Sequence, residues 1–224
     1  MSSFAEILDR AFKRHGKPEM QAHLEASVPK SSAELSAIPD NRWLSQATRC
    51  VFQAGFNWKV IEAKWDGFET AFEGFDIGRW VLANDDDIAR LVGDKRIVRN
   101  PQKIRTVPEN ARFIAEISNI HNGFGTWISQ CSPTERNLLL EELNKRGSRL
   151  GAMTGQYFLR FLGADCYILS RDVTAALVHQ GIIDKQPTSK KAMAAVQEAF
   201  NGWMDDSGYT LTQISRVLAR SIDG

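Results

Sequence analysis

A turn that combines glycines with basic side chains is the part of the sequence whose residue types most directly suggest chemistry. It reads Lys145, Arg146, Gly147, Ser148, Arg149, Leu150 and Gly151. A glycine-containing turn between two helices can direct backbone N–H groups at an anion, and the N-terminus of the second helix adds its dipole. The basic side chains would supply the charge that holds a phosphate. The alternative is that the glycines only close a connection between two helices.

Charge is segregated along the chain, although the total is nearly balanced. The 224 residues include 28 Lys and Arg and 27 Asp and Glu, a formal net charge of +1 that excludes a uniformly basic nucleic-acid coat. Residues 95–108 carry five basic side chains and residues 145–160 carry four, with no acidic one in either window, so the rest of the chain carries 1 − 9 = −8. Two such windows suit phosphate contacts, and solvated surface faces are the alternative.

Helical periodicity dominates the chain on both sides of the basic turn. Apolar residues recur at steps of three and four in the ranges 43–54, 104–120, 192–203 and 211–218. Asp40 is expected to cap the first of these helices, and Ser132 with Glu135 has the pattern of a capping box. No alternating apolar run is followed by an Asn-Gly or Asp-Gly hairpin signal. The sequence therefore predicts an all-α fold of about a dozen short helices.

Residues 1–39 are expected to form a separate region from the main body. The stretch 17–39 mixes proline, serine and charged residues, whereas the helical pattern is regular after it. We expect residues 1–39 to be an N-terminal helix and linker that packs on a domain formed by residues 40–224.

The cysteines and the N-terminus indicate the compartment. The three cysteines are far apart in the sequence and form neither a CxxC motif nor a Cys/His cluster. The N-terminus is charged throughout and lacks the apolar region of a signal peptide, and no apolar run approaches the roughly 20 residues that span a bilayer. We expect a reduced, cytosolic protein with no membrane partner.

An ordered series of sequence blocks resembles the bacterial DNA-3-methyladenine glycosylase I family, which belongs to the helix-hairpin-helix glycosylase superfamily. The blocks are Gln53-Ala54-Gly55-Phe56-Asn57-Trp58, Phe68-Glu69-Thr70-Ala71-Phe72, Ile97-Val98-Arg99-Asn100, the turn Lys145–Gly151, and Phe161-Leu162-Gly163. The resemblance covers roughly residues 40–180. It implies a two-lobed, all-helical glycosylase-like fold that binds duplex DNA through the hairpin and flips out a damaged base.

The resemblance also assigns residues to the base pocket and to DNA contacts. Trp58 corresponds to the tryptophan of the family's base pocket, and Phe56, Trp65 and Tyr157 are possible further walls, while Gln53 offers an amide to a base edge. Aromatics at helical spacing are otherwise core, which we predict for Phe68, Phe72 and Trp203. The expected DNA contacts are Lys145, Arg146, Gly147, Ser148, Arg149, Gly151, Arg99 and Lys103.

The chain departs from the family pattern at its acidic positions. Cys50 stands where the family carries a pocket glutamate, and its place on an apolar helix face predicts a buried small hydrophobe. Ser170 stands where related glycosylases carry an aspartate. Asp172 follows two residues later, so we take Asp172 and Gln53 as the candidate catalytic residues. Asp172 also suits the N-cap position of a helix over 173–179, and its place at a helix start favours this capping role over the catalytic one.

The cysteine and histidine ligands of the family's zinc site have no counterparts, because no cysteine precedes Cys50 or follows Cys166. We expect no metal and no nucleotide cofactor.

Three hypotheses of function remain open at the level of the sequence. The first is a monomeric DNA glycosylase of base-excision repair in the bacterial cytosol, acting on an alkylated base in duplex DNA. A cationic base is already a good leaving group, so a weak catalytic apparatus can suffice. The second is a non-catalytic DNA-binding relative that keeps the hairpin and pocket. The third is a helical interaction protein that has kept only the fold.

Overall fold

The computed structural model describes residues 2–222, and all regular elements in that range are helices. The all-α prediction is therefore confirmed. The described chain divides into two compact units: unit 1 comprises residues 2–30, 132–139 and 163–222, and unit 2 comprises residues 31–131 and 140–162. This division groups the chain differently from the boundary expected at residues 39 and 40, which stays a prediction. No helix in the described part is both long and apolar enough to cross a bilayer.

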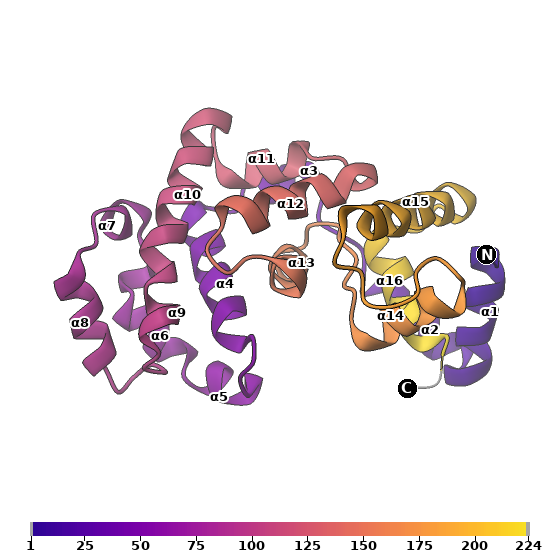
Figure 1. Cartoon of the computed structure of the whole chain (residues 1–224), viewed down its shortest axis with the longest axis horizontal. Coiled ribbons are helices and arrows are strands. Elements are labelled where there is room, and N and C mark those ends of the chain that lie inside the picture. The colour runs from indigo at the N-terminus through magenta and orange to yellow at the C-terminus, as the bar shows by residue number, and fades with distance from the viewer. Residues whose placement is uncertain (1, 223–224) are drawn as a thin grey trace. The chain divides into compact units, whose positions relative to one another are not determined.

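Unit 2 is built around α4, which packs against α10, α11 and α13 (Figure 1). Its helices are α3 (Ser32–Ser36), α4 (Asp40–Gln53), α5 (Trp58–Ala63), α6 (Trp65–Ala71), the 3-10 turn η1 (Glu73–Phe75), α7 (Ile77–Val81), α8 (Asp85–Gly93), α9 (Pro101–Ile104), α10 (Thr106–His121), α11 (Phe124–Gln130), the later part of α12 (Arg136–Arg146), and α13 (Ala152–Phe161). The helices are short because glycine, asparagine or proline interrupts the apolar stripes at short intervals.

Aromatic rings form the core beside α4 in unit 2. Trp65, Phe68, Phe72 and Phe75 stack in near-parallel pairs, with ring centroids 5.1 Å apart for Trp65 and Phe68 and 5.2 Å apart for Phe72 and Phe75. Phe68 and Phe72 are fully buried, as predicted. Each aromatic pair adds about 0.5–1.5 kcal/mol beyond the burial of its area.

The turn η1 adopts a left-handed backbone at three consecutive residues. Glu73, Gly74 and Phe75 have φ values of 54°, 66° and 60°, a conformation that costs energy at residues other than glycine. Asn41 and Arg42 of α4 both donate to the carbonyl oxygen of Gly74, at 3.2 and 2.7 Å. These bonds, together with the stacking of Phe75 in the core, hold the turn against its strain.

Helix α11 approaches α3 so closely that a side chain has no room between them. A Cβ atom at Gly125 would lie 2.1 Å from the carbonyl oxygen of Leu35 in α3 and 3.1 Å from the indole nitrogen of Trp43 in α4. The backbone contact between the two helices therefore requires glycine at this position.

Unit 1 is built around α16, which packs against α1, α2, α14 and α15 (Figure 1). Its helices are α1 (Phe4–His15), α2 (Lys17–Glu25), the 3-10 turn η2 (Pro133–Glu135), the first residues of α12, α14 (Arg171–His179), α15 (Lys190–Ser207) and α16 (Leu211–Arg220). Trp203 of α15 is fully buried, which confirms its predicted place in the core.

An extended segment, residues 165–168, is held along α16 by side chains rather than by a strand partner. Asp165 accepts the backbone N–H groups of Leu211 and Thr212 at 3.1 and 2.8 Å and so satisfies the start of α16. In return, Ser215 accepts the backbone N–H of Ile168 at 3.0 Å. The segment thus satisfies its backbone groups without a sheet.

Two helix starts differ from the sequence-based expectation. Asp40 is not a cap but the first residue of α4, and its carboxylate accepts the backbone N–H of Phe124 at 3.0 Å, so it fastens the start of α11. Ser132 caps the short turn η2, accepting from Thr134 at 3.2 Å, and α12 begins only at Arg136. In both cases the local pattern predicted the helix start to within a few residues. It did not predict which backbone group the side chain binds.

Candidate functional site

The connection between α4 and α5 brings several predicted site residues together. Gln53 ends α4 and Trp58 begins α5, so only residues 54–57 separate the two helices. Gly55 has a φ of 68°, which reverses the chain, and the side chain of Asn57 caps α5. The turn thereby presents Trp58 at the first position of α5.

Lys103 of α9 binds the backbone at the start of this turn. Its ammonium group donates to the carbonyl oxygens of Phe52 and Ala54 at 3.1 and 2.7 Å, at the end of α4 where helix carbonyls lack partners. Burial, followed by the charge of Arg149, lowers the pKa of Lys103. Lys103 was predicted as a DNA contact, and the structure shows it bound to the protein's own backbone.

Three aromatic side chains meet beside the turn. The ring of Trp58 lies edge-on to those of Tyr157 and Phe161 of α13, with centroids 5.2 and 6.0 Å apart. Trp58 is 41% exposed and Phe161 is 45% exposed, so the cluster is open to solvent. Phe56 is also exposed, at 45%. Trp58 and Tyr157 were predicted from the sequence, whereas Phe161 was not, because it continues the apolar stripe of a helix.

Trp65 lies in the aromatic core of unit 2 and not in the exposed cluster. It is 7% exposed, stacks on Phe68, and its indole N–H donates to Glu69 at 3.1 Å. The guanidinium of Arg49 lies 4.4 Å from its ring centroid. The role of Trp65 as a pocket wall stays a prediction.

Cys50 is a buried, neutral thiol. It is 3% exposed, as its helix face predicted, and its sulfur accepts a hydrogen bond from Gln46 at 3.3 Å. Burial raises the pKa of the Cys50 thiol to about 12. Position 50 therefore supplies no negative charge at physiological pH.

The burial of Cys50 predicts slow modification of its thiol. At pH 8 we expect Ellman's reagent to modify Cys131, which is half-buried. Modification of Cys50 and Cys166 should be slower by a factor of roughly 100 or more, because both thiols are buried. Absorbance at 412 nm should report one fast thiol in the native protein and three in guanidinium. The Cys131→Ser variant should abolish the fast phase, and a fast phase that survives this substitution would show that one of the buried cysteines is accessible.

Glu62 of α5 is an acidic residue of this region that the sequence analysis did not single out. The amide nitrogen of Gln53 donates to its Oε1 at 2.7 Å, and the guanidinium of Arg49 lies 3.4 Å from its Oε2. Glu62 follows Trp58 by four residues, a spacing that puts the two on one helix face and that could have identified it from the sequence.

The turn between α12 and α13 is fastened by a buried asparagine. Asn110 of α10 is fully buried, and its side chain both accepts the backbone N–H of Ser148 at 2.7 Å and donates to the backbone carbonyl of the same residue at 3.1 Å. Glu109 accepts a hydrogen bond from the Ser148 hydroxyl. The backbone of the turn at Ser148 is therefore committed to the protein, while neighbouring side chains point to solvent.

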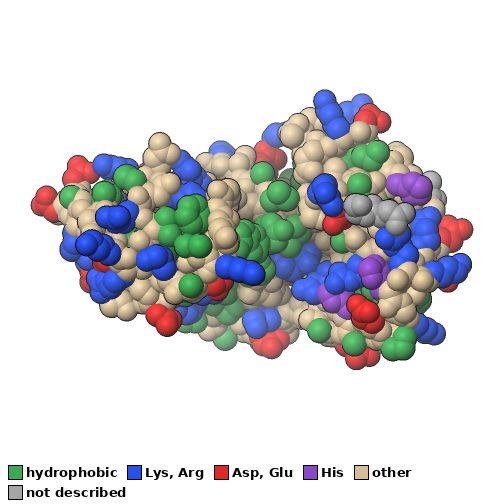
Figure 2. All heavy atoms as spheres, turned by 90° about the horizontal axis from the view of Figure 1, so that it is seen from below, with side chains coloured by type: hydrophobic (Ala, Val, Ile, Leu, Met, Phe, Trp, Pro, Cys, Tyr) green, Lys and Arg blue, Asp and Glu red, His purple; other side chains and the backbone are tan. Residues whose placement is uncertain are grey.

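Most basic side chains of the two charged windows have partners in unit 2. Arg146 pairs with Glu116 at 3.0 Å, Arg149 donates to Gln102 at 2.8 Å, and Lys145 lies 4.0 Å from Glu142. In the first window, Arg96 pairs with Asp94 and Arg105 with Asp85. Such exposed pairs are worth about 0–1 kcal/mol each, so a phosphate can compete for these side chains. Figure 2 shows Lys and Arg side chains scattered over the face that it presents rather than gathered in one field.

Asp172 lies in unit 1, whereas the other candidates lie in unit 2. The cap of α14 is Ser170, whose hydroxyl accepts the backbone N–H of Val173 at 3.3 Å, so the predicted capping role of Asp172 is wrong. Asp172 instead occupies the first turn of α14, where its carboxylate pairs with Arg171 at 3.1 Å. The catalytic assignment of Asp172 stays a prediction.

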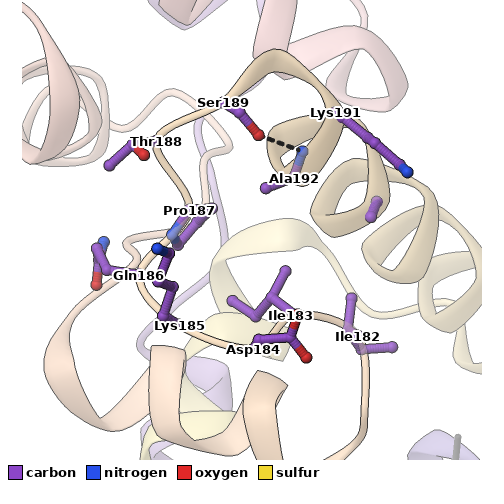
Figure 3. A pocket seen from close by; sticks show the side chains of 11 residues that line it. Ile182, Ile183, Asp184, Lys185, Gln186, Pro187, Thr188, Ser189, Lys191 and Ala192 are labelled. Carbon is purple, nitrogen blue, oxygen red and sulfur yellow. Dashed lines mark hydrogen bonds between the residues drawn. The ribbon is translucent and has the colours of Figure 1, made fainter.

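None of the predicted site residues lines two of the hollows in the described part of unit 1. One, of about 340 Å³, is formed by the segment Ile182–Ser189 and the start of α15 (Figure 3). The other, of about 420 Å³, has a basic lining of Arg10, Lys13, Arg14 and His179 that neither charged window includes. Among residues 2–222, no three His, Cys, Asp or Glu side chains lie together as a metal ion would need. The expectation that the chain holds no metal stays a prediction.

Part of the chain matches a known family. Residues 41–148 match the family of methyladenine glycosylases, so the match includes α4, the exposed Trp58 and the approach to the α12–α13 turn. None of the proteins with curated descriptions matches the chain.

A solved structure similar to the chain is a crystal structure of 3-methyladenine DNA glycosylase I, with 21% sequence identity and a TM-score of 0.48. The alignment covers 62% of this chain and 81% of that one. The family match agrees with the family suggested by the sequence blocks: residues 41–148, just under half of the chain, match the methyladenine glycosylase family.

Proposed function

We propose that the protein is a DNA glycosylase that removes a cationic, alkylated base such as 3-methyladenine from duplex DNA. The observation that carries this proposal is the exposed cluster of Trp58, Tyr157 and Phe161 within a chain that matches the methyladenine glycosylase family. A base cannot react inside the stack, so the enzyme must offer aromatic faces that replace the lost stacking. An exposed tryptophan face also attracts a cation more strongly than other aromatic side chains do.

The proposed reaction is a hydrolysis that makes small demands on the protein. Water adds to C1′ of the deoxyribose, the bond from C1′ to the base nitrogen breaks, and its electron pair neutralises the cationic base as it leaves. The proton of the attacking water passes to solvent. Because the leaving base is already activated by its charge, stacking and orientation can supply most of the required selectivity.

The α12–α13 turn is the proposed contact to the DNA backbone. Lys145 is largely exposed, and a phosphate can replace the ion pair of Arg146 with Glu116 and the bond of Arg149 to Gln102. The guanidinium of Arg146 also lies 5.1 Å from the ring centroid of Phe113. The bonds from Asn110 fix the position of the turn relative to α10. Lysine and arginine side chains on a rigid turn can fix the register of a duplex without reading its sequence.

The chain also supports a second candidate, a DNA-binding relative without catalytic activity. The observation that favours it is the neutral thiol at position 50, since no carboxylate lies at this place on α4. This candidate predicts salt-sensitive duplex binding with no release of bases.

The test incubates the protein with duplex DNA treated with a methylating agent and separates the released bases by chromatography. We expect release of 3-methyladenine, and Trp58→Ala should lower its rate by roughly 10- to 100-fold, because stacking of one base on an aromatic side chain contributes about 1–3 kcal/mol. Trp58→Phe should keep most of the rate. Ile120→Ala, which removes another exposed apolar side chain of unit 2, is the control and should leave the rate unchanged. Duplex binding without release would support the second candidate, and neither binding nor release would contradict both.

A further inference from the structure

We propose that Glu62 determines the preference for a cationic base, because its carboxylate meets the positive charge of a base that stacks on Trp58. This inference rests on the proposed function and concerns the same site. It assigns a specificity role to a residue on α5, and it does not make Glu62 a participant in bond breaking.

The first support is the placement of the carboxylate beside the exposed aromatic cluster. Trp58 and Glu62 are four residues apart on α5, so their side chains lie one above the other on one helix face. The Glu62 side chain is 49% exposed and Trp58 is 41% exposed. A ligand on the Trp58 ring can therefore reach the carboxylate without entering the core.

The second support is the way in which α4 holds the carboxylate. Gln53, which is 4% exposed, donates to Oε1 at 2.7 Å, and Arg49 lies 3.4 Å from Oε2. Arg49 is itself placed over the ring of Trp65, 4.4 Å from its centroid. A glutamate whose two oxygens face two fixed donors has lost most of its rotamer freedom before a ligand arrives, which lowers the cost of binding.

The third support is an unsatisfied group on Gln53. Its Nε2 must face Glu62, because a carboxylate only accepts hydrogen bonds, and this orients Oε1 away. Oε1 is buried and receives no hydrogen bond from the described residues of the protein. A buried acceptor without a partner is costly, so the orientation of the Gln53 amide is dictated by its bond to Glu62.

Glu69 shows by contrast what a structural carboxylate looks like in the same unit. It accepts hydrogen bonds from both terminal nitrogens of Arg42, from the hydroxyl of Ser45 and from the indole of Trp65. Burial by itself would raise the pKa of Glu69, but the bonds from Arg42 and Ser45 outweigh it and the pKa is lowered. Glu69 is thus fully engaged within the fold, while Glu62 keeps half of its surface open to a ligand.

The test uses two small probes that share one ring system: 3,9-dimethyladeninium, which its N3-methyl group makes a cation, and neutral 9-methyladenine. Their dissociation constants would be measured by calorimetry with the full chain. We expect the wild type to prefer the cation and Glu62→Gln to weaken cation binding by roughly fivefold, with binding of the neutral probe unchanged within a factor of about two. Glu62→Asp, which keeps the charge, should retain the preference.

The matched control is Glu73→Gln, since Glu73 is 48% exposed and is paired with Arg79 and Arg90. It should leave both dissociation constants unchanged. The inference is overturned if the wild type does not prefer the cation, or if Glu62→Gln weakens the binding of both probes equally. It is also overturned if Glu73→Gln changes the dissociation constants as Glu62→Gln does. A charge preference that depends on Glu62, in a protein that releases no base from methylated DNA, would uphold the role of Glu62 and contradict the glycosylase activity.

Discussion

Replacing Gly125 with alanine is expected to lower the free energy of unfolding by about 3 kcal/mol or more, at the upper end of what overpacking costs. The new methyl group would lie 2.1 Å from the carbonyl oxygen of Leu35, which belongs to backbone and cannot rotate aside. It would also press on the indole nitrogen of Trp43, which donates to Ile38 at 3.2 Å. The helix pair α3 and α11 would have to separate, and the buried side chains around Trp43 would lose contacts with it.

The measurement is urea unfolding followed by circular dichroism and by tryptophan fluorescence. Gly202→Ala is the matched control, because Gly202 lies inside α15 and a Cβ atom there meets no other atom within 4 Å. That variant should gain about 0.5–1 kcal/mol, since alanine favours a helix over glycine. Two glycine-to-alanine changes in helices should therefore shift stability in opposite directions. Equal shifts would contradict the close approach of α11 to α3.

Asn110→Ala is expected to cost about 2–4 kcal/mol of unfolding free energy and to weaken duplex binding at least roughly tenfold. The substitution leaves the backbone N–H and carbonyl groups of Ser148 without their partner, and each unsatisfied buried group costs about 1–3 kcal/mol. The turn between α12 and α13 would lose its fixed position on α10, and with it the arrangement of Lys145 and Arg149.

The control for this variant is Asn41→Ala, which removes a half-buried asparagine with a single bond to the carbonyl of Gly74. We expect that change to cost no more than about 1 kcal/mol and to leave duplex binding unchanged. Fluorescence anisotropy with a labelled duplex at two salt concentrations would report the affinity. Wild-type affinity of Asn110→Ala in a folded state would show that the turn does not contact the DNA.

Much of the fold could be predicted because its helices obey a local rule. The apolar stripe at residues 43–54 corresponds to α4, which spans Asp40–Gln53, and the buried faces of Phe68, Phe72 and Trp203 follow from the same spacing. The starts of helices were less predictable. Asp40 binds a backbone group 84 positions away in the chain, and no local pattern reports such a partner.

The left-handed turn at Glu73–Phe75 could not be predicted for a related reason. Two of its three residues are not glycine, and their conformation is held by Asn41 and Arg42 of another helix. Local preference alone would have assigned these residues to an ordinary turn. The tertiary bonds outweigh this preference.

The candidate site was predictable where a single residue type carries the chemistry. An exposed Trp58 against Tyr157 follows from the motif that contains it, whereas Phe161 looked like any other apolar residue of a helix. The carboxylate of Glu62 was missed because acidic residues are common on helix surfaces. Its significance depends on Gln53 and Arg49, which reach it from a different helix.

The division of the chain into units has a consequence for the order of folding. Unit 1 joins residues 2–30 to residues 163–222, and its hydrogen bonds span large sequence separations. Gln180 accepts the backbone N–H of Ser2 at 2.9 Å, and Gln213 donates to the carbonyl oxygen of Leu24 at 3.1 Å, across 178 and 189 positions. Closing such long loops costs entropy before any contact repays it, and high contact order slows folding.

During synthesis, α1 and α2 emerge before α16, so they must wait for the helix against which they pack. Unit 2 is complete once residue 162 has emerged, so it can fold while the apolar faces of α1 and α2 remain uncovered. Until α16 has emerged, the uncovered apolar faces of α1 and α2 are therefore sites for aggregation and for chaperone binding.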